Sequence, residues 1–142
     1  MWSSKRNVTI TYKPLQSTSS QLLLDDIVSY QPRSSDKVKT VNGIDTASGT
    51  DAGTWDWRGK GWLKIASSHW EVLGWGDLDG GERWVVTYFA KTLFTPAGID
   101  VYYSAKEGAP EAVLENIKGA LSRIEDAAVK KLAGEIFEVE RD

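Results

Sequence analysis

The sequence predicts a mainly β protein, an antiparallel up-and-down β-barrel with one C-terminal amphipathic α-helix. Between about residues 5 and 105, short runs rich in Val, Ile, Thr, Tyr and Trp alternate with clusters of Gly, Ser, Asp, Asn and Pro, a pattern typical of strands and turns. Beyond residue 105 the apolar period lengthens from two residues to about 3.6, which indicates a helix. With 142 residues, the chain is expected to form a single domain over residues 1–142.

Seven segments carry the strand pattern, and loops rich in small and polar residues separate them. The sequences SGTDAG and DLDGGE mark two of these loops, because Gly and Asp favour the backbone conformations that tight turns need. In chain order, the strand segments are NVTITYKPL, QLLLDDIVSYQP, KVKTVNGIDTA, TWDWRG, LKIASSHWEVLGWG, RWVVTYFAKTLF and IDVYYS.

Alternation along each segment predicts which side chains share a face of the sheet. In the first segment, Val8, Ile10 and Tyr12 fall on one face and polar residues fall on the other. In the sixth segment, Trp84 falls on the apolar side. Thr87 is expected to point outward, because the charged residues of that segment share its parity.

The last element is expected to be one helix over about residues 110–133. Pro110 suits the first turn of a helix, and Gly134 is a natural residue for its C-terminal end. Apolar residues form one stripe along this stretch, and charged residues occupy the rest of its surface. The stripe consists of Val113, Leu114, Ile117, Leu121, Ile124, Ala128 and Leu132.

Consecutive antiparallel strands predict a meander that curls into a barrel. An open sheet of seven strands would leave two unpaired edges, so closure or a pairing partner is expected. The helix is then expected to pack against the outside or one end of the barrel. A Greek-key sandwich is the alternative, because loop lengths alone do not exclude it.

Composition excludes several classes of function. The chain has 17 basic and 20 acidic residues and a net charge of −3, so we expect no nucleic-acid partner. It has no cysteine and one histidine, which argues against disulfides, thiolate catalysis and a metal site. No glycine-rich phosphate loop opens a helix, so no cofactor is expected. No apolar run approaches the roughly 20 residues that span a bilayer, so we expect a soluble, cytoplasmic protein without a membrane partner.

Five stretches of the chain carry a resemblance to a known family. They are MWSSKRNVTITYKPL, LLDDIVSYQ, DKVKTVNGIDT, TWDWRGKGWLKIASSHWEVLGWG and WVVTYFAKTLFTPAGIDVYYS. Together they resemble the successive strands of small lipocalin-like (calycin-type) β-barrel proteins, found mainly in fungi and largely without assigned function. The resemblance covers roughly residues 1–105, and the Trp-rich block is its most specific part.

The resemblance implies a barrel with a ligand cavity, and it carries over no catalytic residue. Such proteins have a further strand with a Gly-x-Trp element before the segment that begins here as Met1-Trp2. This chain starts one strand later. The tail at residues 135–142, or a second subunit, is therefore expected to pair at this edge of the barrel.

Six of the seven tryptophans lie between residues 53 and 84. Indole rings supply large apolar walls and an N–H donor, so this density predicts a cavity for a flat, apolar molecule. A packed barrel core is the alternative for any single ring, since aromatic residues are favoured in strands. The predicted ligand-binding residues are Trp55, Trp57, Trp70, Trp84, Tyr88 and Tyr103, with Arg58 as a partner for a ligand carboxylate or phenolate.

His69 and Glu71 are the candidate catalytic residues. His69 is the only histidine, and Glu71 follows two residues later on the same strand face. Trp70 has the opposite parity, so His69 faces away from a cavity that Trp70 faces, unless a bulge in the strand reverses the parity. Asp25 and Asp26 also lie on opposite faces. Whichever of them points inward is a candidate general acid, because burial raises the pKa of a carboxyl group.

These features predict that the protein binds a small hydrophobic molecule, aromatic or polyketide-like, in a Trp-rich barrel cavity. Two alternatives remain. One is a cofactor-independent enzyme of secondary metabolism, of the cyclase, isomerase or lyase type, which uses the same cavity to position a substrate. The other is a structural or interaction protein that forms a homodimer through exposed strand edges and the C-terminal helix.

Overall fold

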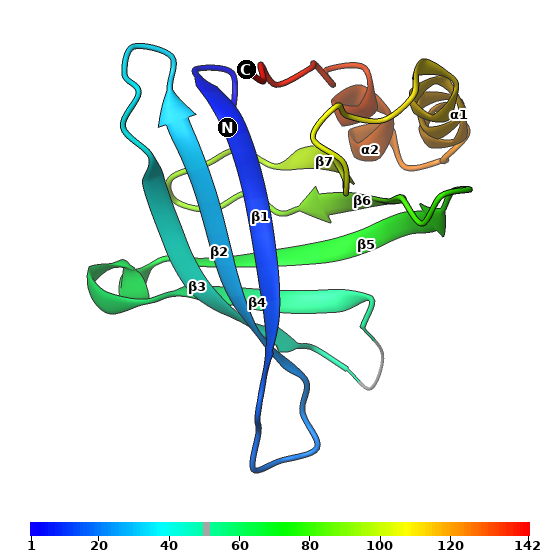
Figure 1. Ribbon diagram of the computed structural model, residues 1–142. Helices are drawn as coiled ribbons and strands as arrows, with labels where there is room; N and C mark the ends of the chain where they lie inside the picture. Colours follow the sequence, from blue (N-terminus) through cyan, green and yellow to red (C-terminus); the bar gives the residue numbers. More distant parts are fainter. Residues whose placement is uncertain (50–51) are drawn as a thin grey trace. The chain divides into compact units, whose positions relative to one another are not determined.

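The computed structural model describes residues 1–49 and 52–142, and its main element is a sheet of seven strands (Figure 1). The strands pair in chain order from β1 to β7, and the registers from β1 to β5 are antiparallel. This order confirms the mainly β class and the up-and-down connection, and it differs from that of a Greek key. The strands are β1 (Lys5–Leu15), β2 (Leu23–Pro32), β3 (Lys39–Ala47), β4 (Thr54–Gly59), β5 (Ser67–Asp77), β6 (Arg83–Phe89) and β7 (Gly98–Tyr103).

The C-terminal region forms two α-helices, whereas the apolar stripe predicts one continuous helix. Helix α1 spans Glu111–Ser122 and α2 spans Ala127–Ala133. The Asp126 side chain accepts hydrogen bonds from the backbone N–H groups of Ala128 and Val129, at 2.9 and 3.0 Å. This aspartate caps the start of a second helix inside the stripe. Within the described part of the chain, no helix has the length and apolar character needed to cross a membrane.

The strand expected to start at Leu63 begins later. Residues Gly61–Ile65 form a short 3₁₀-helix, η1, and β5 starts at Ser67. Gly61 has a φ of 62°, a left-handed conformation that glycine adopts without steric cost. The chain therefore turns tightly between β4 and β5, and the apolar residues of η1 belong to a loop.

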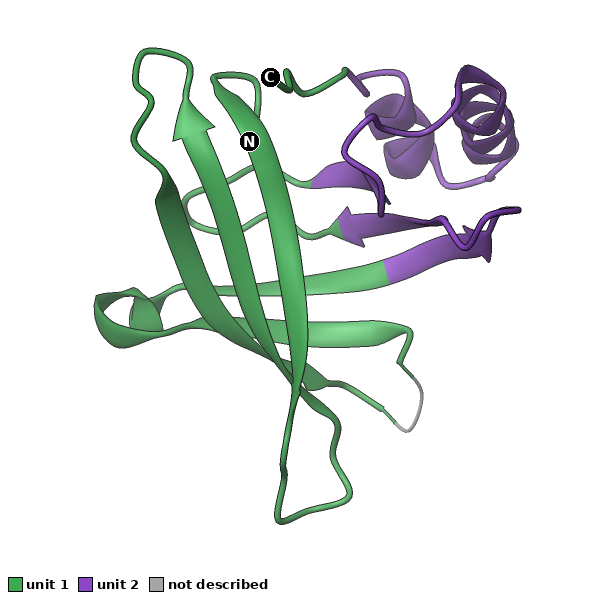
Figure 2. Ribbon diagram, viewed as in Figure 1, with its two compact units in different colours: residues 1–71, 89–97, 138–142 green, residues 72–88, 98–137 purple. Residues whose placement is uncertain are grey.

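The chain divides into two compact units (Figure 2). Unit 1 comprises residues 1–71, 89–97 and 138–142, and unit 2 comprises residues 72–88 and 98–137. In unit 2, Val86 of β6 packs with Ile117 and Leu121 of α1, which confirms the inward side of that helix. Thr87 is also buried, at 4% exposure, so its predicted outward position is wrong. Threonine is small and β-branched, so it fits a covered position in a strand. The charged residues of the same parity do not fit such a position.

Unit 1 has two sheet faces of different chemistry. The registers of β2, β3 and β4 place Val28, Ala47 and Trp55 on the same face as two buried aspartates, Asp26 and Asp45. We name this face the acid-pair face. The opposite face of the same strands carries the single histidine, and we name it the histidine face.

The C-terminal tail returns to β1 within unit 1. Glu140 forms a parallel bridge with Arg6, and the Glu140 carbonyl accepts a hydrogen bond from the Asn7 N–H at 2.8 Å. Asn7 has a φ of 51°, where the register between β1 and β2 shifts. Asparagine tolerates this left-handed conformation better than most residues. The C-terminal tail is one of the two partners expected for the first strand, and Glu140 of the tail pairs with Arg6 of β1.

Candidate functional site

The two buried aspartates come from neighbouring strands and lie diagonally across one ladder. Asp26 of β2 is paired with Gly43 of β3, and Asp45 lies two residues beyond Gly43 on the same face. Diagonal neighbours of this kind approach closely enough for their side chains to interact. Asp26 is 7% exposed and Asp45 is 0% exposed. We name these two residues the acid pair.

Strand alternation explains why one of two consecutive aspartates is buried. Asp25 lies on the histidine face, where the Lys60 ammonium donates to its carboxylate at 2.6 Å. Asp26 has the opposite parity and shares the acid-pair face with the buried Val28. Of the pair that the sequence left open, Asp26 is therefore the carboxyl group removed from water.

A stack of aromatic rings borders the acid pair. The Trp70 indole Nε1 donates a hydrogen bond to Asp45 Oδ1 at 2.9 Å. The Trp70 ring stacks between Tyr12 and Trp55, with centroid distances of 5.9 and 5.7 Å and interplanar angles of 28° and 14°. The Trp55 Nε1 donates to the Ala52 carbonyl at 2.9 Å, so this buried indole is also satisfied.

Trp57 completes the aromatic border on the other side of Asp45. It is the direct partner of Asp45 in the β3–β4 register, and its ring covers Gly43. A Cβ atom added at Gly43 would lie 2.1 Å from Trp57 Nε1. Glycine is therefore required at this position for the indole to reach its place beside the acid pair.

Burial changes the acidity of both carboxyl groups. Burial, the charge of Asp45 and the charge of Asp25 together raise the pKa of Asp26 to about 7. Burial also raises the pKa of Asp45 to about 6, and the hydrogen bonds from Trp70 and Asp26 oppose that rise. Near neutral pH the pair therefore holds about one proton, and Asp26 is the group that donates it to Asp45.

A shared proton also resolves the hydrogen bonding of the pair. Asp26 Oδ1 and Asp45 Oδ2 are buried, and neither atom has a hydrogen-bond partner among the described residues. Two ionised carboxylates side by side are costly in a low-dielectric environment. One proton held between them removes a charge and supplies a donor. The remaining lone pairs of the acid pair can still accept hydrogen bonds.

His69 and Glu71 lie on the histidine face. Asp56 is the direct partner of His69 in the β4–β5 register. His69 Nδ1 lies 2.9 Å from Asp56 Oδ1, and Nε2 lies 3.2 Å from Glu71 Oε1. The hydrogen bond with Asp56, helped by Glu71, raises the pKa of His69, and the same bond lowers the pKa of Asp56. Trp70 points to the opposite face, so His69 is separated from the acid pair by the sheet.

An open groove of about 740 Å³ crosses the histidine face. Arg58 lies in this groove, and its Nη1 donates to the Lys64 carbonyl at 2.9 Å. Arg58 has the opposite parity to Trp57, so it does not join the aromatic residues of the acid-pair face. The side chains along the groove include Thr46, Asp56, Arg58, Lys60, Lys64, Ser67, His69 and Lys91.

The remaining predicted ligand-binding residues belong to unit 2. Trp84 packs against the core of that unit and covers Gly76, where an added Cβ would lie 2.7 Å from the indole. The Tyr103 hydroxyl donates to Glu82, and this hydrogen bond raises the pKa of Tyr103 to about 12. Tyr88 is half-buried in β6. Of the predicted aromatic residues, unit 1 brings together Trp55, Trp57 and Trp70.

Sequence reasoning missed Asp45 and did not assign Tyr12 to the site. Asp45 alternates with Gly43 and Ala47 in β3, so its two neighbours on the same face are small. An acidic residue between small residues of the same parity was the available signal, because small residues leave room for a ring to pack beside it. Among the described residues, no group of three or more His, Asp or Glu side chains is arranged to hold a metal ion.

Comparisons of the whole chain with protein-family models, with curated proteins and with solved structures find no match.

Proposed function

We propose that this protein binds a small, largely apolar aromatic molecule on the acid-pair face of unit 1, as a lipocalin-like binding protein. The observation that carries the proposal is the acid pair itself, two buried carboxyl groups bordered by aromatic rings. Asp26, which keeps 7% of its surface exposed, is the group that meets the ligand, and Asp45 holds the Asp26 proton in place.

An apolar core gains little from two carboxyl groups. Leucine or valine at both positions would fill the space without the desolvation cost that buried carboxyls carry. A buried carboxyl group can offset this desolvation cost by selecting a ligand, because a ligand without the matching polar group leaves the carboxyl group without a hydrogen bond. Two partly exposed rings, Tyr12 and Trp57, supply a stacking surface beside it.

The chemistry of the acid pair indicates what the ligand carries. With the shared proton held between its two members, the pair offers its remaining carboxyl lone pairs to a ligand as hydrogen-bond acceptors. A phenol or an enol matches this pattern, because its hydroxyl donates a hydrogen bond. An aromatic carboxylate does not, because it would meet a negative charge in a buried place. A hydroxylated aromatic or polyketide-like molecule therefore fits better than a fatty acid.

The test is a titration of intrinsic tryptophan fluorescence with two probes of the same shape, 1-naphthol and 1-methylnaphthalene. We expect saturable quenching by 1-naphthol at micromolar concentration and binding that is about tenfold weaker for 1-methylnaphthalene, which lacks the hydroxyl group. Asp26→Asn and Asp45→Asn reduce this preference. Asp79→Asn, an exposed aspartate of unit 2, serves as the matched control. Equal affinity for the two probes, or no saturable quenching, contradicts the proposal.

A second candidate is a cofactor-independent enzyme of the isomerase, cyclase or lyase type. The observation that favours it is a carboxyl group whose pKa is raised to about 7, because a general acid or base works best near the operating pH. Asp26 would move a proton to or from a carbon beside a ligand carbonyl. The test is hydrogen–deuterium exchange at the α-carbon of 2-tetralone, followed by NMR. If the exchange rate is equal for the protein and its Asp26→Asn variant, Asp26 does not catalyse proton transfer, and only the binding function remains.

A further inference from the structure

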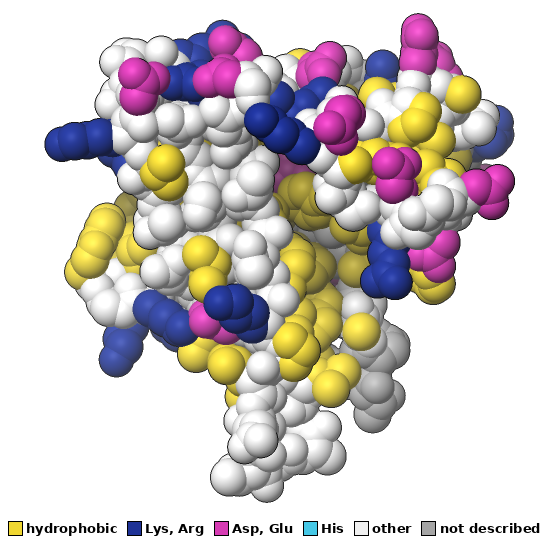
Figure 3. All heavy atoms as spheres, viewed as in Figure 1, with side chains coloured by type: hydrophobic (Ala, Val, Ile, Leu, Met, Phe, Trp, Pro, Cys, Tyr) yellow, Lys and Arg dark blue, Asp and Glu magenta, His cyan; other side chains and the backbone are white. Residues whose placement is uncertain are grey.

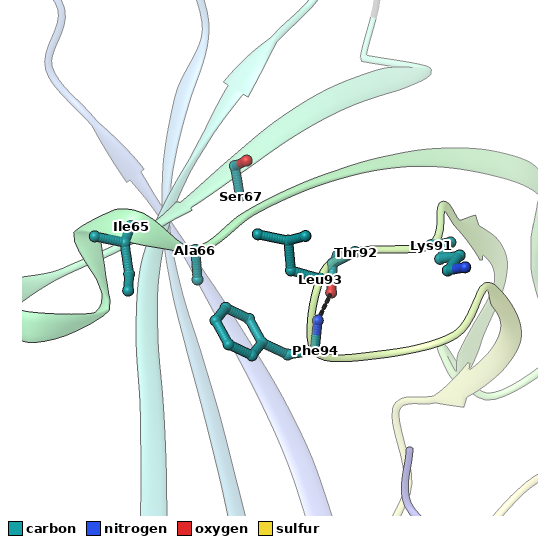
Figure 4. A pocket seen from close by; sticks show the side chains of 7 residues that line it. All are labelled: Ile65, Ala66, Ser67, Lys91, Thr92, Leu93 and Phe94. Carbon is teal, nitrogen blue, oxygen red and sulfur yellow. Dashed lines mark hydrogen bonds between the residues drawn. The ribbon is translucent and has the colours of Figure 1, made fainter.

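Two neighbouring loops of unit 1 expose large apolar side chains to solvent. One loop contains η1 between β4 and β5, and the other connects β6 to β7 over residues 90–97. Residues of both loops line one hollow of about 370 Å³, so the loops lie side by side (Figure 4). We name them the loop pair. Its exposed apolar residues are Trp62 (85%), Ile65 (78%), Leu93 (94%) and Phe94 (68%).

Each loop has internal hydrogen bonds that hold its side chains outward. In the first loop the Leu63 N–H donates to the Lys60 carbonyl at 3.1 Å, and the Ala66 N–H donates to the Leu63 carbonyl at 2.8 Å. In the second loop the N–H groups of Phe94 and Thr95 both donate to the Thr92 hydroxyl, at 3.1 and 3.0 Å. Both loops are therefore hydrogen-bonded turns, and their apolar side chains are exposed in this hydrogen-bonded form.

Cationic side chains flank the loop pair. Lys64 lies within the first loop and Lys91 within the second, and neither forms a salt bridge among the described residues. The groove of the histidine face adjoins the hollow, since Ser67 and Lys91 line both. The carboxylates nearby are already paired, Asp25 with Lys60 and Asp56 with His69. Figure 3 shows apolar side chains with Lys and Arg side chains next to them where Figure 1 places η1.

We propose that the loop pair docks on the surface of a membrane that contains anionic lipids. Trp62 and the apolar residues of both loops enter the interfacial region, and Lys64 and Lys91 contact lipid phosphates. Tryptophan favours this region because its ring is apolar and its N–H is polar, and lysine extends its charge to the headgroups. The combination of apolar tips with unpaired cations on a chain of net charge −3 complements an anionic lipid surface.

The lack of a spanning segment, on which the sequence-based expectation of no membrane partner rested, does not bear on this mode of binding. Peripheral contact needs a small apolar area and positive charge, both of which the loop pair has. Other exposed apolar residues lie elsewhere along the chain, such as Val38 and Trp75, and they do not lie in these loops. Trp75, at 68% exposure in unit 2, is therefore a matched control for Trp62.

The experiment is co-sedimentation of the full chain with vesicles of phosphatidylcholine alone and of phosphatidylcholine mixed with phosphatidylserine. We expect binding to the anionic vesicles that weakens as salt increases. Lys64→Ala or Lys91→Ala is expected to lower the partition coefficient about fivefold. Trp62→Ala combined with Leu93→Ala is expected to lower it at least about tenfold, whereas Trp75→Ala leaves it unchanged.

Thermal unfolding of each variant shows whether its fold is retained. The substituted side chains are exposed, so we expect the variants to fold. The proposal is overturned when the protein does not bind the anionic vesicles, or when the Trp62 and Trp75 variants behave alike. A protein that instead dimerises in light scattering, and becomes monomeric in the Trp62 and Leu93 double variant, also overturns it, because a second copy then occupies the loop pair. Asp45→Asn changes none of these results, so the test is independent of ligand binding on the acid-pair face.

Discussion

Two carboxyl groups, Asp26 and Asp45, are buried together in a small protein, and among the described residues no cation accompanies them. Burial disfavours the charged form of each group, so the pKa of both rises and the pair takes up a proton. This arrangement stabilises the protonated pair and makes the folded state sensitive to pH. The single histidine, by contrast, lies between Asp56 and Glu71 on the other face, where carboxylates favour its protonated form.

Asp26→Asn tests the energetic effect of the acid pair. Folding raises the pKa of Asp26 from its ordinary value of 3.8 to about 7, so the unfolded chain releases its proton first as pH rises. The contribution of Asp26 to the free energy of unfolding should therefore be greatest below about pH 4 and fall by up to about 4 kcal/mol on the way to pH 7. Asparagine does not titrate. Urea unfolding at several pH values should show a flatter profile for the variant and a gain in its stability at pH 8.

Asp79→Asn is the control for that measurement, because Asp79 is exposed in the hairpin between β5 and β6. Its profile should follow that of the unmodified protein. Parallel pH profiles for the Asp26→Asn variant and the unmodified protein would show that Asp26 is not held in its protonated form.

Gly43→Ala tests the packing of Trp57 beside the acid pair. The new methyl group would lie 2.1 Å from the indole nitrogen, so the ring has to leave its place. We expect a loss of about 1–3 kcal/mol in the free energy of unfolding and a shift in tryptophan emission. Gly49→Ala is the matched control, because no atom of the described residues, apart from its chain neighbours, lies within 4 Å of its added Cβ. Equal stability of the two variants would contradict the described position of Trp57.

At the scale of elements, parity and capping decide what each segment contributes. The alternation of β4 and β5 places Trp55 and Trp70 together and sends Asp56 and His69 to the other face. The boundary between α1 and α2 depends on a local hydrogen-bond competitor, Asp126, rather than on the apolar stripe. One strand therefore contributes side chains to both faces of the sheet, and one apolar stripe in the sequence continues over two helices.

Asp126→Ala tests the start of α2. Removal of the side chain leaves the N–H groups of Ala128 and Val129 without their acceptor, so we expect the free energy of unfolding to fall by about 1 kcal/mol. Urea unfolding followed by circular dichroism measures this change. Asp126→Asn keeps a capping side chain and Glu125→Ala alters an exposed neighbour, and both should stay within about 0.5 kcal/mol of the unmodified protein. A similar loss in all three variants would exclude a capping role.

At the scale of the whole chain, the two ends meet within unit 1. The backbone of Glu140 bonds to Asn7, and the backbone of Asp142 bonds to the Asn7 side chain at 2.9 Å. Arg6 pairs with both Asp36 and Asp142. These contacts cover part of β1, the strand at one end of the sheet order. An uncovered strand edge is a site for association with other chains.

Deletion of residues 138–142 tests the importance of this contact. We expect a loss of about 1–2 kcal/mol in the free energy of unfolding, because the hydrogen bonds of Glu140 and Asp142 with Asn7 and the Arg6–Asp142 ion pair disappear. Light scattering should also show more self-association of the shortened chain. Glu140→Ala is the control, since it removes only an exposed ion pair with Arg33 and keeps the backbone bridge. A shortened chain with unchanged stability and unchanged mass would show that the tail does not protect β1.

The pattern of the sequence was sufficient for the elements that rest on local rules. Alternation predicted the seven strands, although the fifth was expected to start at Leu63 instead of Ser67 and the sixth to end at Phe94 instead of Phe89. It also gave the parity of Trp55, Trp57 and Trp70, because successive residues of a strand point to opposite faces. The same rule placed His69 opposite Trp70. It failed at Thr87, where a covered position accepts a residue that the alternation assigned to water.

The sequence by itself determined the mainly β class, the succession of strand segments along the chain and the division of side chains between two faces, since each follows from neighbours along the chain. The structure decided that these strands pair as a meander and not as a Greek key. Only the tertiary structure decided that Asp26 meets Asp45, 19 positions away in the sequence, through the register between β2 and β3. It also decided that the loop of Trp62 lies beside the loop of Leu93. Register depends on the fit of whole strands to one another, and local pattern does not contain that information.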